Sequence, residues 1–265
     1  MPIPTRYESP YHWWGPGPSP SAPLTLRDLL LNRTVDIERA ATLWAALTQQ
    51  RSLTVIGGPS GLGKSTLLHA LLPALPVGTQ RYYLRGCFET FAFQAEPRLP
   101  AAASALLVNE ISPHLPIYLW GPAVQRTLAA GEAGYQILAT AHGRSATEFA
   151  ASLTGSPLRI PARMLGALKL IVLLEPIPQG AGRTVRDLWQ LSAARNGVSI
   201  DHLLPGDIPE GLTPGNVAAA REAVHLLLTQ EPVTTDAASS GHGPGDYRPP
   251  PAHSGSDLEQ TSAGE

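Results

Sequence analysis

The sequence predicts an α/β protein in which a mainly parallel sheet is covered by helices on both faces. Short apolar runs, typical of buried strands, alternate along the chain with amphipathic stretches of helical period. The run LTVIG at 53–57 ends in glycine, as buried parallel strands commonly do. With 265 residues, of which 43% are hydrophobic, the chain can bury a core in one domain of about 200 residues with flanking segments.

Each element of this fold is predicted from a local pattern. Strands are expected at the apolar runs 53–57, 82–84, 105–109, 136–140 and 168–174. Helices are expected where apolar residues recur at helical spacing, at 24–31, 36–49, 64–72, 124–131, 146–153 and 216–228. The third of these helices should end at Pro73, because proline cannot continue a helix. The alternating pattern at 184–191 predicts an edge strand.

Two flanking segments differ in composition from the central domain, which we place at 24–229. Residues 1–23 contain seven prolines and therefore cannot form a regular helix. The aromatic residues of this leader are Tyr7, Tyr11, Trp13 and Trp14. They would pack either on the chain's own domain or on a partner. Residues 230–265 hold few anchoring side chains, so we expect a disordered tail.

Charge and composition exclude several classes of protein. The formal net charge of -2 gives no global attraction for nucleic acid or for an anionic membrane. A single cysteine, Cys87, excludes a disulfide framework and a cysteine-rich zinc site. The chain has no apolar run of about 18 residues and no signal-peptide pattern at its start. We therefore expect a cytoplasmic protein with no transmembrane segment and no direct contact with nucleic acid.

A glycine-rich segment after the first strand matches a phosphate-binding loop. Residues 58–65 read GPSGLGKS and fit the pattern G-x-x-x-x-G-K-[ST]. The glycines let successive N–H groups point at a phosphate, and the following helix presents its positive end to the same anion. Lys64 should reach the β- and γ-phosphates, Ser65 should ligate Mg²⁺, and Thr66 should lie on the α-phosphate side. We thus predict that ATP and Mg²⁺ are bound by Gly58, Pro59, Ser60, Gly61, Leu62, Gly63, Lys64, Ser65 and Thr66.

A carboxylate and a histidine follow two other predicted strands. Glu110 comes after the run 105–109 and is the candidate general base, with a contact to the metal or its water. Asn109 stands where many such enzymes carry aspartate, so Mg²⁺ would rely on Ser65 and water. His142 lies just past the strand at 136–140, where it can contact the γ-phosphate and take part in catalysis. The plainer alternatives are a glutamate that caps a strand end and a structural histidine.

The chain from Leu24 to about Ser192 resembles the ATPase domain of the type II/type IV secretion and pilus-motor ATPases. The lead-in helix with its phosphate loop, the strand LLVNEIS, a segment at 131–142 that resembles the family's His box, and a closing hairpin occur in the family's order. The resemblance implies a RecA-like P-loop NTPase fold and an ATP-hydrolysing motor that works as a hexameric ring. It also implies a cytoplasmic location at the inner face of the membrane, reached through a membrane-platform or secretion-system partner.

Other residues take an expected role only from this resemblance. Glu89 is the candidate for the acidic residue of the family's Asp box, between the loop and the glutamate strand. Arg144 is the preferred candidate for an arginine that contacts nucleotide, and Arg159 and Arg163 are the others. Arginines supplied across a subunit boundary accelerate hydrolysis by about 10³–10⁵-fold. The alternative for all three is ordinary surface solvation.

The chain also departs from the family pattern. About fifty residues precede the loop, where the family carries a separate domain, and the stretch SPHLPIYLW at 112–120 looks inserted. Ser152 stands where the family usually has arginine. Two interpretations stay open beside the motor: a nucleotide-binding scaffold with little turnover, and a small-molecule or nucleotide kinase, although no compact arginine-rich lid is visible. An ABC transporter ATPase is disfavoured, because its signature and helical subdomain have no room before Glu110.

Overall fold

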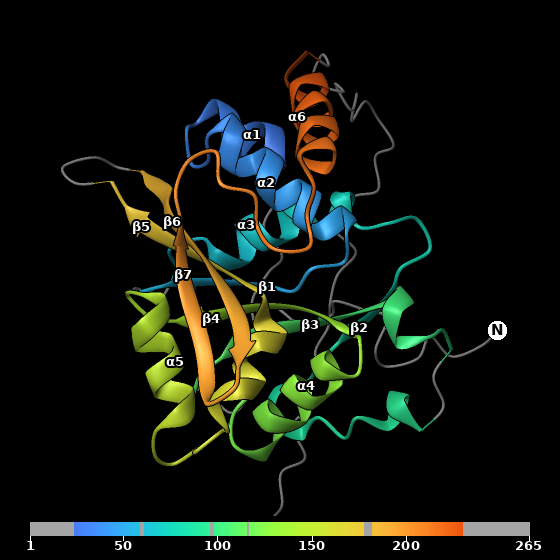
Figure 1. Cartoon of the computed structure of the whole chain (residues 1–265), viewed down its shortest axis with the longest axis vertical. Helices are drawn as coiled ribbons and strands as arrows, with labels where there is room; N and C mark the ends of the chain where they lie inside the picture. The colour runs from blue at the N-terminus through green and yellow to red at the C-terminus, as the bar shows by residue number, and fades with distance from the viewer. Residues whose placement is uncertain (1–23, 59–60, 96–97, 116, 178–181, 230–265) are drawn as a thin grey trace, which may run out of the picture. The chain divides into compact units, whose positions relative to one another are not determined.

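The computed structural model describes residues 24–229 except 59–60, 96–97, 116 and 178–181. The expectations for the leader at 1–23 and the tail at 230–265 fall outside the described residues. Within the described part, the chain forms a seven-stranded sheet with helices on both faces (Figure 1). The predicted α/β class with a mainly parallel sheet is therefore confirmed.

The sheet has the strand order β2-β3-β4-β1-β5-β6-β7. Its strands are β1 (Leu53–Gly57), β2 (Gln80–Tyr83), β3 (Ser104–Ile111), β4 (Gln136–His142), β5 (Leu170–Pro176), β6 (Arg183–Ala194) and β7 (Gly197–Leu203). The strands from β2 to β5 in this order pair in parallel, while β6 and β7 are added antiparallel. The carboxyl ends of β1, β3 and β4 therefore meet at one edge of the sheet, which is where open α/β sheets bind ligands.

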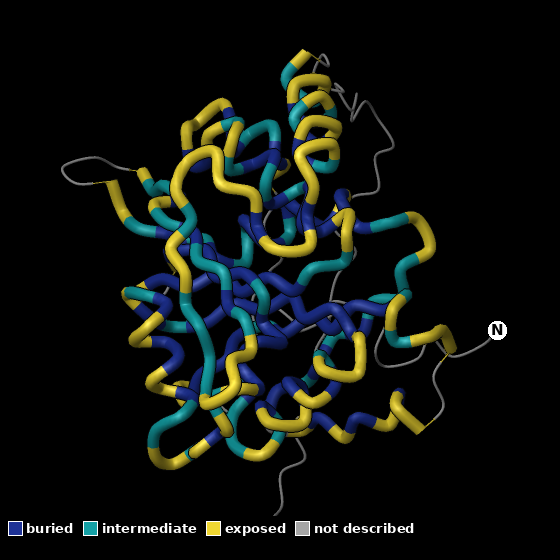
Figure 2. The backbone as a smooth tube through the Cα atoms, in the orientation of Figure 1, coloured by how far each residue is buried: buried dark blue, intermediate teal, exposed yellow. Residues whose placement is uncertain are grey.

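Two layers of helices enclose the sheet. The helices are α1 (Leu26–Leu31), α2 (Ile37–Thr48), α3 (Lys64–Leu71), α4 (Pro122–Glu132), α5 (Ala146–Thr154) and α6 (Pro214–Thr229). One core lies between the sheet and α1, α2, α3 and α6, and a second lies between the opposite face and α4 and α5. Neighbouring residues of β1 show the alternation, because Val55 belongs to the first core and Ile56 to the second. Figure 2 shows the central strands of the sheet buried, whereas the outer surfaces of the helices are exposed.

Local side-chain chemistry explains several helix ends. Thr25 and Asp28 form a reciprocal capping box at the start of α1, and Asp36 and Ser145 cap α2 and α5. α3 ends at Leu71, before Pro73, as the sequence predicts. Pro73 itself lies in the short 3₁₀ helix that follows. No helix among the described residues is long and apolar enough to cross a membrane.

Two predictions about the strands need correction. The segment at 184–191 belongs to β6, which lies between β5 and β7 and is not the edge strand. β7 takes the edge, and it escaped prediction because its residues are half-buried or exposed and form no apolar run. β5 begins at Leu170 rather than Leu168, because a 3₁₀ segment ends at Leu168 and Lys169 adopts a φ of 57°. The Lys169 carbonyl accepts the Leu191 N–H at 2.7 Å, which fixes this turn against β6.

Candidate phosphate-binding site

The segment between β1 and α3 has the backbone that an anion-binding turn requires. Gly61 and Gly63 have φ angles of 76° and 93°, in the left-handed region that favours glycine. α3 begins at Lys64, and no side chain of the described residues caps its N-terminal end. The N–H groups of its first turn, which includes Ser65 and Thr66, are therefore open to an anion, and the positive end of the helix dipole faces the same way.

Close packing holds the start of the loop against the sheet. A Cβ on Gly57 would lie 2.6 Å from Leu62 Cδ2 and 2.9 Å from the Leu174 carbonyl oxygen. Only glycine fits this position without a shift of backbone. Two of the predicted phosphate contacts, Pro59 and Ser60, lie outside the described residues.

A buried ion pair lies where the loop meets α3. Lys64 Nζ lies 3.7 Å from Glu110 Oε2, and the two side chains are only 4% and 10% exposed. Burial lowers the pKa of Lys64, while the negative charge of Glu110 opposes that shift. Glu110 is placed inside β3, near its end, rather than after the strand as predicted, because β3 continues to Ile111 through an irregularity in its pairing with β4.

His142 connects this carboxylate to the loop. It is the last residue of β4, not a residue beyond it, and it pairs in register with Gly57 of β1. Its Nδ1 lies 2.8 Å from the Gly58 carbonyl oxygen, and its Nε2 lies 2.7 Å from Glu110 Oε1. Because a carbonyl oxygen only accepts, the hydrogen of the neutral ring belongs on Nδ1. The imidazole thus bridges the phosphate loop and Glu110.

The donor set at this edge fits a magnesium–nucleotide group. It offers a buried ammonium, an uncapped helix N-terminus, the Ser65 hydroxyl in the first turn, and the Glu110 carboxylate. Despite the short contact with His142, Glu110 Oε1 is buried and receives no hydrogen bond from the described residues. A buried carboxylate oxygen without a donor can bind a cation or accept a proton from water.

His114 is a neighbour of this site that sequence analysis missed. Its ring lies edge to face with that of His142, with ring centroids 4.5 Å apart. Ser112 Oγ holds it through contacts with His114 Nδ1 at 2.7 Å and with the His114 N–H at 3.1 Å. Tyr118 follows nearby, and burial together with the charge of Glu110 raises its pKa. The sequence signal that could have indicated His114 is the stretch at 112–120, which departs from the family pattern.

Arg183 is a second missed residue. It opens β6, and its Nη1 donates to the Leu62 carbonyl oxygen at 3.0 Å and approaches that of Gly61 at 3.5 Å. The guanidinium packs so closely on Gly63 that a Cβ there would lie 2.5 Å from Nη1. The chain thus brings a positive charge to the loop from a strand about 120 residues away in sequence. No local sequence pattern predicts this contact.

Glu89 and Arg144 contact residues outside the cluster of Lys64, Glu110 and His142. Glu89 is buried and accepts hydrogen bonds from the backbone N–H groups of Arg85, at 3.0 Å, and Phe91, at 2.6 Å, so its carboxylate organises its own loop. Arg144 follows β4, and its side chain is 85% exposed. With Gly58, it borders an open hollow of about 490 Å³ beside the end of β5.

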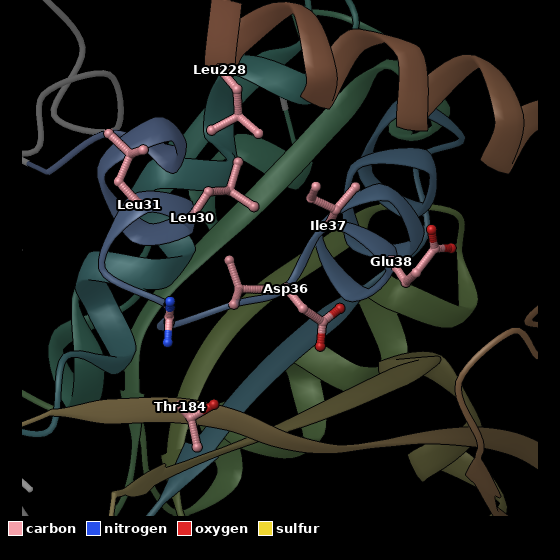
Figure 3. Close-up of a pocket in the computed structure, with 9 residues that line it drawn as sticks. Leu30, Leu31, Asp36, Ile37, Glu38, Thr184 and Leu228 are labelled. Atoms are coloured by element: carbon pink, nitrogen blue, oxygen red, sulfur yellow. The ribbon is translucent and has the colours of Figure 1, made fainter.

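An apolar cavity opens on the face covered by α1, α2 and α6. It has a volume of about 660 Å³ and lies between those helices and the start of β6 (Figure 3). Leu30, Ile37 and Leu228 supply apolar wall, and Asp36 and Glu38 supply carboxylates. Thr184, which also lines it, directly follows Arg183 in the chain, so the cavity adjoins the strand that contacts the phosphate loop.

Comparison with known proteins gives only distant similarity. No family model matches the chain, and no curated protein matches it in sequence. A solved structure of the VirB11 ATPase from the Brucella suis type IV secretion system, in complex with sulphate, is similar with a TM-score of 0.40 and 18% identity over 66% of each chain. The Legionella pneumophila ATPase DotB is similar with a TM-score of 0.36 and 16% identity, over 66% of this chain and 53% of that one.

The chain therefore spans just under two thirds of VirB11 and about half of DotB. Similarity at this level establishes no family membership and no activity. The function of this chain has to be inferred from its own site.

Proposed function

We propose that this chain binds ATP with Mg²⁺ and hydrolyses it on a RecA-like P-loop fold. The observation that carries the proposal is the meeting of Lys64, Glu110 and His142 beside an uncapped helix N-terminus. The strand order also supports it, since β4 lies between the loop strand β1 and the glutamate strand β3 and brings His142 between them.

Each residue has a role that its position supports. Lys64 would neutralise the β- and γ-phosphates, and Ser65 would hold Mg²⁺, with Glu110 on the metal's water. Bound Mg²⁺ supplies positive charge to the phosphate oxygens. Glu110 would orient the attacking water and accept its proton, and His142 would contact the γ-phosphate while its other nitrogen stays on the Gly58 carbonyl.

We further propose that this ATPase is the motor of a secretion or type IV pilus-like assembly system. In this proposal it works in the cytoplasm as a hexameric ring and meets the membrane through a partner protein. The order of loop, Glu110 and His142 along the chain supports the proposal, as it resembles that family. In such a ring the exposed Arg144 would be the arginine offered to nucleotide, and Glu89 is retained as the proposed Asp-box residue.

Phosphate release tests the enzymatic part. We expect Mg²⁺-dependent release by the wild type and loss of ATP binding in Lys64→Ala. Glu110→Gln should still bind ATP but release phosphate about 10²–10⁴-fold more slowly. Lys169→Ala is the matched control, because Lys169 is the other lysine of the chain and lies at the opposite end of β5 from the loop.

A nucleotide-binding scaffold with little turnover is the second candidate. The observation that favours it is the engagement of Glu110 by both Lys64 and His142, which occupies the carboxylate that would act as base. If the wild type binds ATP but releases phosphate no faster than Glu110→Gln, the scaffold is correct and the motor is not.

Light scattering tests the hexameric ring. The measured mass should rise several-fold with ATP, and a monomer under every nucleotide condition would exclude the ring.

We assign the nucleoside to the apolar cavity of Figure 3. Thr184 lines this cavity, and its neighbour in the chain, Arg183, contacts the loop, so the cavity is the candidate for the nucleoside of a nucleotide whose phosphates bind the loop. Thr184→Trp should weaken ATP binding while leaving pyrophosphate binding unchanged. Equal weakening of both ligands would place the nucleoside elsewhere.

A further inference from the structure

We propose that Glu110, His114 and His142 form a binding site for a transition-metal ion of the zinc class. One ligand atom from each residue lies within 4.8 Å of those of the other two. The three residues come from the end of β3, the stretch after it and the end of β4. The set shares Glu110 with the proposed magnesium position but differs from it in its two histidines, whereas the magnesium position depends on the Ser65 hydroxyl.

The hydrogen bonding of His142 points its second nitrogen at the site. Its Nδ1 is 2.8 Å from the Gly58 carbonyl oxygen, so in the neutral ring that nitrogen carries the hydrogen and Nε2 keeps a lone pair. Nε2 lies 2.7 Å from Glu110 Oε1, a buried oxygen that no hydrogen bond from the described residues satisfies. Two electron-rich atoms this close need either a proton between them or a metal cation beside them. A histidine that gives its other N–H to a backbone carbonyl is the usual arrangement of a metal ligand.

His114 is held in a way that suits a third ligand. Ser112 Oγ contacts its Nδ1 at 2.7 Å and also accepts the His114 backbone N–H at 3.1 Å. This fixes the ring and leaves Nε2 as the nitrogen that can bind an ion. Its ring centroid lies 4.5 Å from that of His142. His114 is exposed, so an ion can enter from solvent.

The chemistry of the donors selects the class of ion. Two imidazoles and one carboxylate suit Zn²⁺ and the similar ions Co²⁺ and Ni²⁺, whereas Mg²⁺ prefers oxygen ligands. Lys64 contacts Glu110 through Oε2, so Oε1 is the oxygen left for the ion. Three protein ligands leave one position open for water, as in exchangeable zinc sites.

In this proposal the stretch at 112–120 has a function, metal binding, that the ATPase chemistry does not assign to it. It contributes His114, and through His114 it adds a ligand to the two groups already beside the loop. An ion on Oε1 would also prevent Glu110 from accepting a proton. Inhibition of hydrolysis by Zn²⁺ is therefore expected, a consequence that depends on the proposed function, whereas metal binding itself does not.

Zinc titration without nucleotide tests the site. The full chain, freed of metal by a chelator, is titrated with Zn²⁺ against a chromogenic competitor, and Co²⁺ absorbance is recorded in parallel. We expect one equivalent to bind the wild type, and His114→Ala to bind roughly tenfold or more weakly. His225→Ala, which changes an exposed histidine of α6, should bind like the wild type. Circular dichroism checks that both variants are folded.

Two outcomes would overturn the proposal. Absence of Zn²⁺ binding by the wild type would mean that only a proton lies between His142 and Glu110. Equal affinity in the wild type and His114→Ala would mean that the ion binds elsewhere. Because the titration contains no ATP, neither result depends on whether the chain hydrolyses nucleotide. In a separate assay with Mg²⁺, His114→Ala should release phosphate normally and resist inhibition by Zn²⁺.

Discussion

Removing the charge of Glu110 should expose how strongly this carboxylate stabilises the nucleotide-free protein. Glu110→Gln keeps the shape of the side chain but leaves Lys64 buried without its negative partner, since the lysine side chain is only 4% exposed. Lys64→Met removes the other charge, and the double variant removes both. The three variants together form a thermodynamic cycle for the pair.

The geometry sets the expected size of the effect. Opposite charges 3.7 Å apart attract by about 4 kcal/mol at an effective dielectric constant of about 20, and desolvation offsets part of this. Breaking a buried pair by removing one partner costs about 3 kcal/mol, whereas removing both partners costs less because no buried charge is left unpaired. The double variant should therefore lose at least about 2 kcal/mol less than the sum of the two single variants.

Urea unfolding, followed by circular dichroism without nucleotide, measures the cycle. The exposed pair between Arg221 and Glu38 provides the matched control and should show much weaker coupling, because its side chains are 41% and 51% exposed. Additive losses at Lys64 and Glu110, within about 0.5 kcal/mol, would refute the electrostatic reasoning.

Three further predictions concern the loop and its lysine. Arg183→Ala removes the hydrogen bond to the Leu62 carbonyl and should weaken ATP binding about tenfold in a calorimetric titration; unchanged affinity would mean that the guanidinium does not shape the loop. Gly57→Ala should destabilise the fold by about 1–3 kcal/mol in urea, whereas Gly58→Ala, with open space at its Cβ, should not; equal effects would contradict the packing argument. Because burial lowers the pKa of Lys64 below 10.5, the unfolded chain binds more protons than the folded chain between the two pKa values. The free energy of unfolding of the wild type should therefore increase relative to that of Lys64→Met as pH rises toward 10.5, and a difference that stays constant with pH would contradict this reasoning.

Much of the fold could be predicted because its signals are local. The run at 53–57 became β1 with the predicted bounds, and the helix after it begins at Lys64 as expected. Parallel topology then places the ends of β3 and β4 at one edge, which is why Glu110 and His142 could be proposed together from their positions after apolar runs. What the pattern misjudged was where those strands end, since both residues lie inside them.

The rest depends on contacts between distant segments. Arg183 reaches the loop through the β5–β6 hairpin, and His114 reaches His142 through an irregular stretch that no periodicity describes. β7 lacks an apolar run because an edge strand is only partly covered. The dipeptide Asn196-Gly197, which spans the end of the turn and the first residue of β7, is nevertheless a typical hairpin signal. Glu89 was chosen by resemblance alone, and its carboxylate is held by the N–H groups of its own loop.

The place of β4 in the sheet makes His142 a spacer as well as a contact. Neighbouring strands lie about 4.8 Å apart, so the strand of Glu110 and the strand that leads into the loop are separated by about twice that distance. His142, at the end of β4, lies in this interval and contacts both Glu110 and the Gly58 carbonyl. The side chain at position 142 therefore helps to position the Glu110 carboxylate relative to the loop, and a smaller residue there would alter that position without a change at Glu110.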